Sequence, residues 1–137
     1  MKHSGKLIPC LLSAMILAGC QTPRTSGVEV DVREGAPAYL RWDDSGFAQH
    51  VELAETPIMA RTEFGVLRSD VRVRNRKARD FAFQYKFCWF DANGLEVMPG
   101  KGIWEQKTIH GHETASLVGV APDPSAVRFA VRLRRVR

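Results

Sequence analysis

The chain has 137 residues, 45% of them hydrophobic, and a formal net charge of +5. This length suits one ordinary domain with a single hydrophobic core, and the sequence contains no internal repeat or low-complexity segment, which excludes a repeat array. The modest positive charge favours anionic partners such as lipid headgroups or acidic envelope polymers.

The N-terminal segment has the features of a secretory signal. Lys2 and Lys6 form a positively charged start, and a mostly apolar run at residues 7–18 follows it. This run is too short for a membrane-spanning helix, which needs about 20 apolar residues. Residues 17–20, LAGC, end the run with a pattern that resembles the lipobox of bacterial lipoproteins.

The lipobox resemblance implies that residues 1–19 are removed as a signal peptide and that Cys20 becomes an acylated N-terminus. Two or more acyl chains hold a protein stably on a bilayer. Gln21, rather than Asp, follows the cysteine, as in Gram-negative lipoproteins that are sorted to the outer membrane. We therefore expect a lipid-anchored outer-membrane protein that faces the periplasm and has no nucleic-acid partner. The alternative is an ordinary secretory signal in which Cys20 is incidental.

Cysteine usage argues against an intramolecular disulfide in the mature chain. Cys10 leaves with the signal and Cys20 is expected to be acylated, so Cys88 is the remaining thiol. In an oxidising compartment, Cys88 could form an intermolecular bridge or act as a reactive thiol. We favour a half-buried strand cysteine that packs as a small hydrophobic side chain.

The mature chain is expected to begin with a polar tether, residues 20–27, and an extension, residues 28–48. Within the extension, VEVDVR at 28–33 alternates and could be an additional strand or an ordered tail. LRWDDSGF at 40–47 has the pattern of a strand that leads into a turn. The sequence leaves the structure of this extension open, and we place the main domain at residues 49–137.

The main domain alternates apolar and polar side chains with a period of two. The alternation is clearest in residues 66–75, 80–91 and 126–134, and it predicts strands with one buried face and one solvated face. Turn sequences separate the strands, including an Asn-Gly pair at 93–94. The pattern predicts an all-β fold, an antiparallel β-sandwich of about six to seven strands.

The same alternation predicts which side chains face the core. The predicted core consists of Val71, Val73, Phe83, Tyr85, Phe87, Trp89, Phe129, Val131 and Leu133. Trp42, Trp89 and Trp104 could stack on sugars. Core packing is nevertheless our expectation for both Trp89 and Trp104, and Trp104 is the better candidate for an exposed contact.

A larger segment of the main domain resembles a known family. The stretch RVRNRKARDFAFQYKFCWFDANGLEV and the following IWEQKTIHGHETASLVGVAPDPSAVRFAVRLR closely resemble the YcfL-like family of predicted periplasmic lipoproteins, a domain of unknown function. The resemblance covers about residues 64–135, with a weaker match from about Gln49. It implies an immunoglobulin-like β-sandwich and an outer-membrane lipoprotein, and it assigns no catalytic residue.

His110, His112 and Glu113 form a possible metal-binding cluster, because residues i and i+2 on a strand share a face. Relatives of the family have a Gly-Pro-Gly-Glu-like hairpin turn at this place, and Gly111 suits such a turn. His50 is far away in the sequence as a third ligand. We therefore expect a turn here, and neither a metal ion nor a cofactor.

The sequence contains no nucleophile elbow, no HExxH motif and no Gly-rich phosphate loop. Two classes of function remain. The first is a non-catalytic binding or scaffold module that contacts a protein or cell-wall partner in the envelope. The alternative is an envelope-polymer hydrolase whose active-site residues are dispersed in the sequence. We favour the first class and expect no catalytic residues.

Arginines alternate with the predicted core residues on two strands. They lie opposite the buried side, and we expect them either to form a solvated face that keeps a sheet edge from pairing or to contact an anionic surface. The candidate contact residues are Arg72, Arg74, Arg128, Arg132 and Arg134.

Overall fold

The computed structural model describes residues 26–31, 39–41 and 45–136. Cys20, the signal and most of the tether therefore lie outside the described residues. The described part contains two short helices, α1 (Ser45–Ala48) and the 3-10 helix η1 (Pro99–Lys101), and nine strands: β1 (Ser26–Asp31), β2 (Tyr39–Arg41), β3 (Val51–Leu53), β4 (Ile58–Arg61), β5 (Leu67–Asn75), β6 (Phe81–Phe90), β7 (Glu105–Ile109), β8 (Thr114–Val120) and β9 (Arg128–Arg135).

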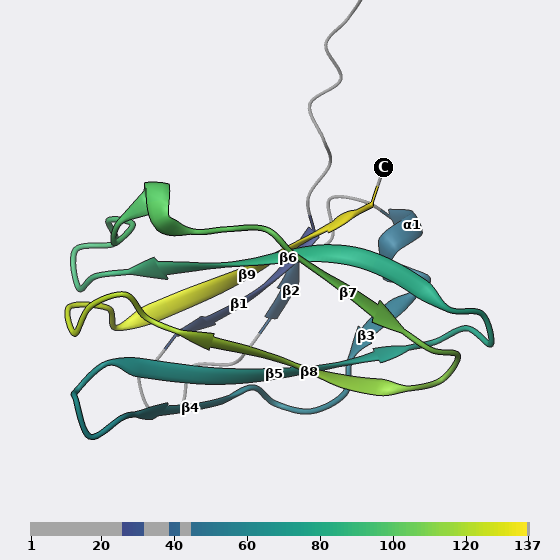
Figure 1. Cartoon of the computed structure of the whole chain (residues 1–137), viewed down its shortest axis with the longest axis horizontal. Coiled ribbons are helices and arrows are strands. Elements are labelled where there is room, and N and C mark those ends of the chain that lie inside the picture. Colours follow the sequence, from purple (N-terminus) through teal and green to yellow (C-terminus); the bar gives the residue numbers. More distant parts are fainter. Residues whose placement is uncertain (1–25, 32–38, 42–44, 137) are drawn as a thin grey trace, which may run out of the picture.

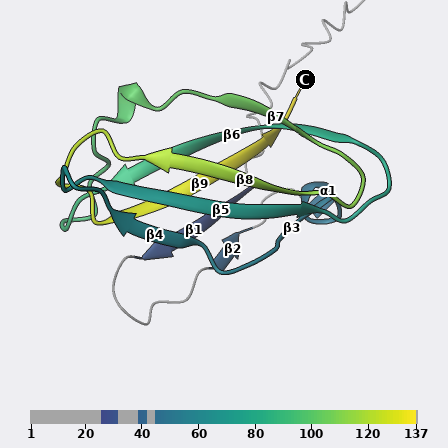
Figure 2. The same ribbon diagram turned by 60° about the horizontal axis from the view of Figure 1, so that its bottom comes forward.

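The strands form two antiparallel sheets that pack face to face as a β-sandwich (Figure 1). The first, here called the β6 sheet, has the order β2-β1-β9-β6-β7. In the second, the β5 sheet, β8 pairs with one edge of β5, and β3 and β4 follow one another along the other edge. Figure 2 shows β5 and β8 side by side in front of β9 and β6. The main domain contributes seven of the strands, β3 to β9, as the spacing of the turns predicts.

The core lies between the inner faces of the two sheets. Of the nine predicted core residues, eight are buried, and Phe87 packs against the buried cluster while it keeps part of its ring exposed. The register places Trp89 opposite Phe129 and Phe87 opposite Val131 on neighbouring strands. Because directly opposed residues share a face of the sheet, alternation on each strand produces one continuous apolar layer. The prediction of strand faces is confirmed.

The N-terminal extension is integrated into the sandwich. β1 pairs with β9 over the whole of Ser26–Asp31, and β2 pairs with β1. The helix α1 places Phe47 in the core, where its ring meets Phe81 edge-on with centroids 5.3 Å apart. Of the two alternatives for residues 28–33, the strand is therefore the one observed over its described part. The strand already begins at Ser26, within the predicted tether.

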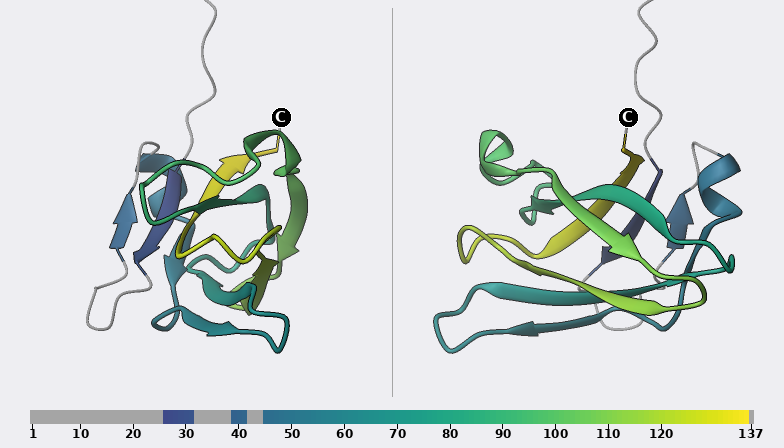
Figure 3. Two further views of the ribbon diagram at one scale, coloured as in Figure 1. Left: turned by 90° about the vertical axis from the view of Figure 1, so that its left-hand side faces the viewer. Right: turned by 45° about the vertical axis from the view of Figure 1, so that its right-hand side comes forward.

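Asn75 joins two turns at one end of the sandwich. Its buried side-chain amide donates to the carbonyl oxygens of Arg79, Ile109 and His110 at 2.7–3.2 Å, and its Oδ1 accepts from the Lys77 N–H at 2.9 Å. These bonds satisfy the buried amide completely and hold the β5–β6 turn against the β7–β8 turn. The two views in Figure 3 show the layers and their connecting turns.

Candidate functional site

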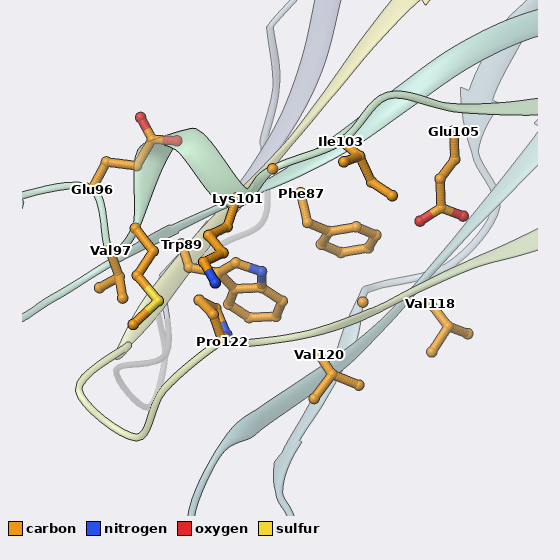
Figure 4. Close-up of a pocket in the computed structure, with 13 residues that line it drawn as sticks. Phe87, Trp89, Glu96, Val97, Lys101, Ile103, Glu105, Val118, Val120 and Pro122 are labelled. Carbon is orange, nitrogen blue, oxygen red and sulfur yellow. The ribbon is translucent and has the colours of Figure 1, made fainter.

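A cavity of about 190 Å³ opens between the β8 strand and the segment that connects β6 to β7 (Figure 4). Phe87 and Trp89 of β6 contribute aromatic rings, and Val118 and Val120 lie on the β8 side. The connecting segment contributes residues 96–98 and 101–103. The site therefore combines three segments that are separated in the sequence. We call this cavity the β8 pocket.

The aromatic wall of the pocket is held rigidly from behind. The rings of Phe87 and Trp89 are stacked, with centroids 5.7 Å apart and an interplanar angle of 14°, and both contact the buried ring of Phe129. Gly119 lies directly against the Phe87 ring, and a Cβ placed there would come within 2.5 Å of a ring atom. The glycine thus lets an aromatic ring approach the backbone of β8 closely.

The rim of the pocket exposes large apolar side chains. The exposed fractions are 45% for Met98, 71% for Ile103, 41% for Val118 and 55% for Val120. Met98 also has a φ of 47°, a left-handed conformation that is uncommon for a residue other than glycine. Isolated exposed apolar residues are ordinary, whereas a group around a cavity marks a binding surface.

Three charged residues line the pocket: Glu96, Lys101 and Glu105. The hydroxyl of Tyr85 donates a hydrogen bond of 2.8 Å to the carboxylate of Glu105. Burial, followed by this hydrogen bond and the charge of Glu105, raises the pKa of Tyr85 to about 12. The phenol therefore stays protonated at neutral pH and keeps donating to Glu105, which fixes one carboxylate at the end of the pocket.

A family model described as "Protein of unknown function (DUF1425)" matches residues 38–135. The chain belongs to this family. A DUF1425 family member from Shewanella has a similar crystal structure, with a TM-score of 0.57 and 23% identity over 81% of this chain and 90% of that one. The Campylobacter jejuni protein cj0090 is similar with a TM-score of 0.51 and 18% identity, over 59% of this chain and 83% of that one. Both likenesses show the fold. No curated protein matches the chain.

The arginines of this DUF1425 chain do not share one surface. Arg72 and Arg74 lie on the outer face of the β5 sheet, and Arg128, Arg132 and Arg134 lie on the outer face of the β6 sheet. The outer faces of a sandwich point in opposite directions. The candidate set of five is therefore two groups, and a single flat surface cannot contact both at once.

Several of these arginines have partners within the domain. Arg72 lies 3.2 Å from a carboxylate oxygen of Glu55. The guanidinium of Arg128 lies over the ring of Phe90, 4.5 Å from its centroid. Arg134 lies 3.9 Å from the centroid of the Trp104 ring and donates to Gln84 at 2.8 Å.

Trp104 does not pack in the core, so that expectation was wrong. It lies half-buried on the outer face of the β6 sheet, where the guanidinium of Arg134 and the ammonium of Lys86 both lie over its ring. Alternation could not place it, because Trp104 directly precedes β7 and belongs to no strand. Trp89, in contrast, is buried as predicted. Trp42 lies outside the described residues.

Cys88 is buried on β6, directly opposite Ala130 of β9. Burial raises the pKa of its thiol, so that the unreactive protonated form dominates at neutral pH. This environment agrees with packing as a small hydrophobic side chain.

Residues 110–113 form the predicted turn. Glu113 accepts a hydrogen bond from the His110 N–H at 2.8 Å, and His112 has a φ of 60°. A Cβ at Gly111 would meet the Ala78 carbonyl oxygen at 2.1 Å, so the close approach of two turns requires glycine there. In the described part of the chain, no three His, Cys, Asp or Glu side chains gather as metal ligands.

The longest helix among the described residues, α1, has four residues, and none of the described helices is long and apolar enough to span a bilayer.

Proposed function

We propose that this protein is a lipid-anchored binding module of the bacterial cell envelope, held at the periplasmic side of the outer membrane through acyl chains on Cys20. The β8 pocket carries the binding part of this proposal, because aromatic rings and exposed apolar side chains surround a cavity on a rigid sandwich. The LAGC motif at residues 17–20 carries the anchor. The proposal also places the chain with the YcfL-like lipoproteins within its family.

The geometry of the tether supports this arrangement. Ser26 is six positions after Cys20, and a fully extended chain of that length reaches about 20 Å. Ser26 pairs with Leu133 near the end of β9. Val120, which lines the pocket, pairs with Arg68 of β5. Arg68 is near the start of β5, whereas Asn75 is at its other end. An anchored domain would therefore present the pocket at some distance from its point of attachment.

The anchor is tested by mass spectrometry of the protein extracted from native membranes. The expected result is loss of residues 1–19 and the added mass of acyl chains at Cys20. Cys20→Ala should leave the precursor uncleaved by the lipoprotein peptidase. An unmodified Cys20 in the mature protein contradicts the anchor.

The binding part is tested by photo-crosslinking in living cells. A photoreactive amino acid at Val120 should give a discrete envelope adduct, whereas the same group at Ile58 should not. Ile58 is a matched control, because it is 56% exposed and lies on the same sheet, away from the pocket. Equal labelling from both positions contradicts a role for the pocket.

A further inference from the structure

The outer edge of β8 carries backbone groups that no strand among the described residues pairs with. β8 pairs with β5 alone, in seven consecutive register positions. Bonds at both ends of this ladder set its phase: Asn75 N–H to Glu113 O at 2.9 Å and Ala121 N–H to Leu67 O at 2.7 Å.

Hydrogen-bonded and non-bonded pairs alternate in an antiparallel ladder. Counting from the two end bonds, Ala115, Leu117 and Gly119 exchange backbone hydrogen bonds with β5. The intervening residues direct their N–H and C=O groups away from the sheet, toward the open edge: Ser116, Val118 and Val120.

The edge of β8 also lacks the usual protection against pairing. Proteins commonly guard an exposed edge with charged residues, a proline, a bulge or a short strand. β8 has seven residues, TASLVGV, without a charge or a proline, and its register runs without a bulge. β7, an edge strand of the other sheet, has five residues and carries Glu105 and Lys107. The exposed edge of β8 is therefore better suited than that of β7 to accept another strand.

The unprotected edge and the β8 pocket adjoin each other. Val118 and Val120 belong to both, since both line the pocket and both direct backbone groups toward the edge, while their exposed side chains alternate with the core-facing Leu117 and Gly119. A strand added here would lie about 4.8 Å from β8 and extend the β5 sheet. Every second side chain of that strand would point between the sheets, toward the rings of Phe87 and Trp89.

We propose that β8 and its pocket bind an extended peptide segment of a partner protein, which adds to the β5 sheet as a strand and inserts a large apolar side chain against Phe87 and Trp89. This inference rests on the proposed binding function and names its ligand class. An extended polypeptide is the ligand whose N–H and C=O groups repeat with the spacing that an open strand edge offers. Neither an acyl chain nor a sugar has this repeat.

The charges around the pocket refine the ligand. Glu96 and Glu105 supply two negative charges and Lys101 one positive charge. A segment with a Lys or Arg beside its apolar residue should therefore bind more tightly than one with a Glu there. Charge complementarity of this kind contributes more to the choice between partners than to the binding affinity itself.

The probe is a blocked nine-residue peptide of alternating Thr and Val, with Phe at the centre and a Lys on either side of the Phe. The isotope-labelled protein is extracted from membranes into detergent micelles. The peptide is titrated into it, and the titration is followed by NMR. Peptide binding should slow amide exchange at Ser116, Val118 and Val120 by about tenfold or more, since these N–H groups gain partners. Replacing the central Phe by Ala, or methylating alternate peptide nitrogens, should each weaken binding by about tenfold or more.

Protein variants separate the edge from the pocket. Val118→Pro removes one outward N–H, which an edge strand tolerates, and should abolish the protection at β8. Val118→Thr keeps the N–H and should weaken binding much less than Val118→Pro; equal losses in the two variants would contradict a role for this N–H. Val120→Lys should weaken binding of the Lys-flanked peptide by charge repulsion, whereas Ile58→Lys, at a similarly exposed position of the same sheet, should not. A Glu-flanked peptide should bind more weakly than the Lys-flanked one.

Equal binding of the N-methylated peptide, or amide changes confined to other strands, overturns the proposal. Sedimentation that shows a dimer with β8 amides already protected also overturns it, because the occupant is then a second copy of the chain. Acylation is read from the mass of Cys20 and peptide binding from the β8 amides, so the anchor and the peptide site can fail separately.

Discussion

The ring of Phe87 occupies the space that a side chain on Gly119 would need. A Cβ at Gly119 would lie 2.5 Å from the ring, which is closer than nonbonded carbon atoms approach in folded proteins. This contact joins the two sheets at the floor of the β8 pocket, and it links the size of residue 119 to the position of an aromatic ring.

Gly119→Ala should therefore force the Phe87 ring to move and should destabilise the domain by about 1–3 kcal/mol, the usual range for overpacking. Urea unfolding followed by fluorescence measures this change. Gly100→Ala is the control, because a Cβ there meets no atom within 4 Å. Equal stability of both variants would show that the ring does not constrain residue 119.

Asn75→Leu should cost about 3 kcal/mol of unfolding free energy, because the buried amide no longer donates to three carbonyl oxygens, one of them buried and two part-buried. Asn75→Asp isolates the donors: its carboxylate can still accept from the Lys77 N–H but cannot donate to the three carbonyls. We expect both variants to be destabilised in denaturant titrations. A stable Asn75→Asp variant would contradict a role of the three donated bonds in holding the two turns together.

Tyr85 should make stability depend on alkaline pH. Its pKa rises from 10.0 to about 12 in the folded state, so the protonated phenol is favoured by folding. The resulting stabilisation is fully present below pH 10 and is lost as the pH rises from 10 toward 12.

Denaturant midpoints of the parent and of Tyr85→Phe, measured at several pH values from 9 to 12, test this dependence. The difference between the two proteins should shrink as the pH rises through this interval, because Phe does not titrate. A constant difference would contradict the raised pKa.

The two arginine groups should behave differently on anionic liposomes. The tether enters at β1, which pairs with β9, so the β9 arginines are in the sheet that is nearer the proposed anchor. Arg128→Glu with Arg132→Glu should reduce sedimentation with anionic liposomes more than Arg72→Glu with Arg74→Glu. The mature chain with Cys20→Ser, which cannot be acylated, serves as the parent for both.

Salt provides the control for this experiment. The electrostatic screening length falls from about 10 Å at 0.1 M salt to about 3 Å at 1 M, so binding by the arginines must weaken. Equal recovery with anionic and neutral liposomes leaves the arginines as a solvated surface only, and equal effects of the two double variants contradict the predicted difference between the two groups.

Local alternation was sufficient to predict β5, β6 and β9 and their buried faces. Side chains of a strand point to opposite sides in turn, so the apolar residues of β5, β6 and β9 indicate the core without knowledge of the neighbours. The turn at residues 110–113 was also predictable, because Gly111 sits among polar residues. Trp104 was misplaced because this rule holds only inside a strand, and Trp104 precedes one.

The sequence by itself determined the class of antiparallel sandwich and the buried sides of β5, β6 and β9, because a period of two is a property of a single strand. The tertiary structure decided which strand neighbours which. Alternation shows that Arg72 and Arg132 both point away from the core, but sheet membership puts them on opposite faces. The β8 pocket and the open edge beside it likewise depend on long-range pairing, since among the described strands β5 is the single partner of β8. Such pairing reflects packing of the whole chain, and no local pattern encodes it.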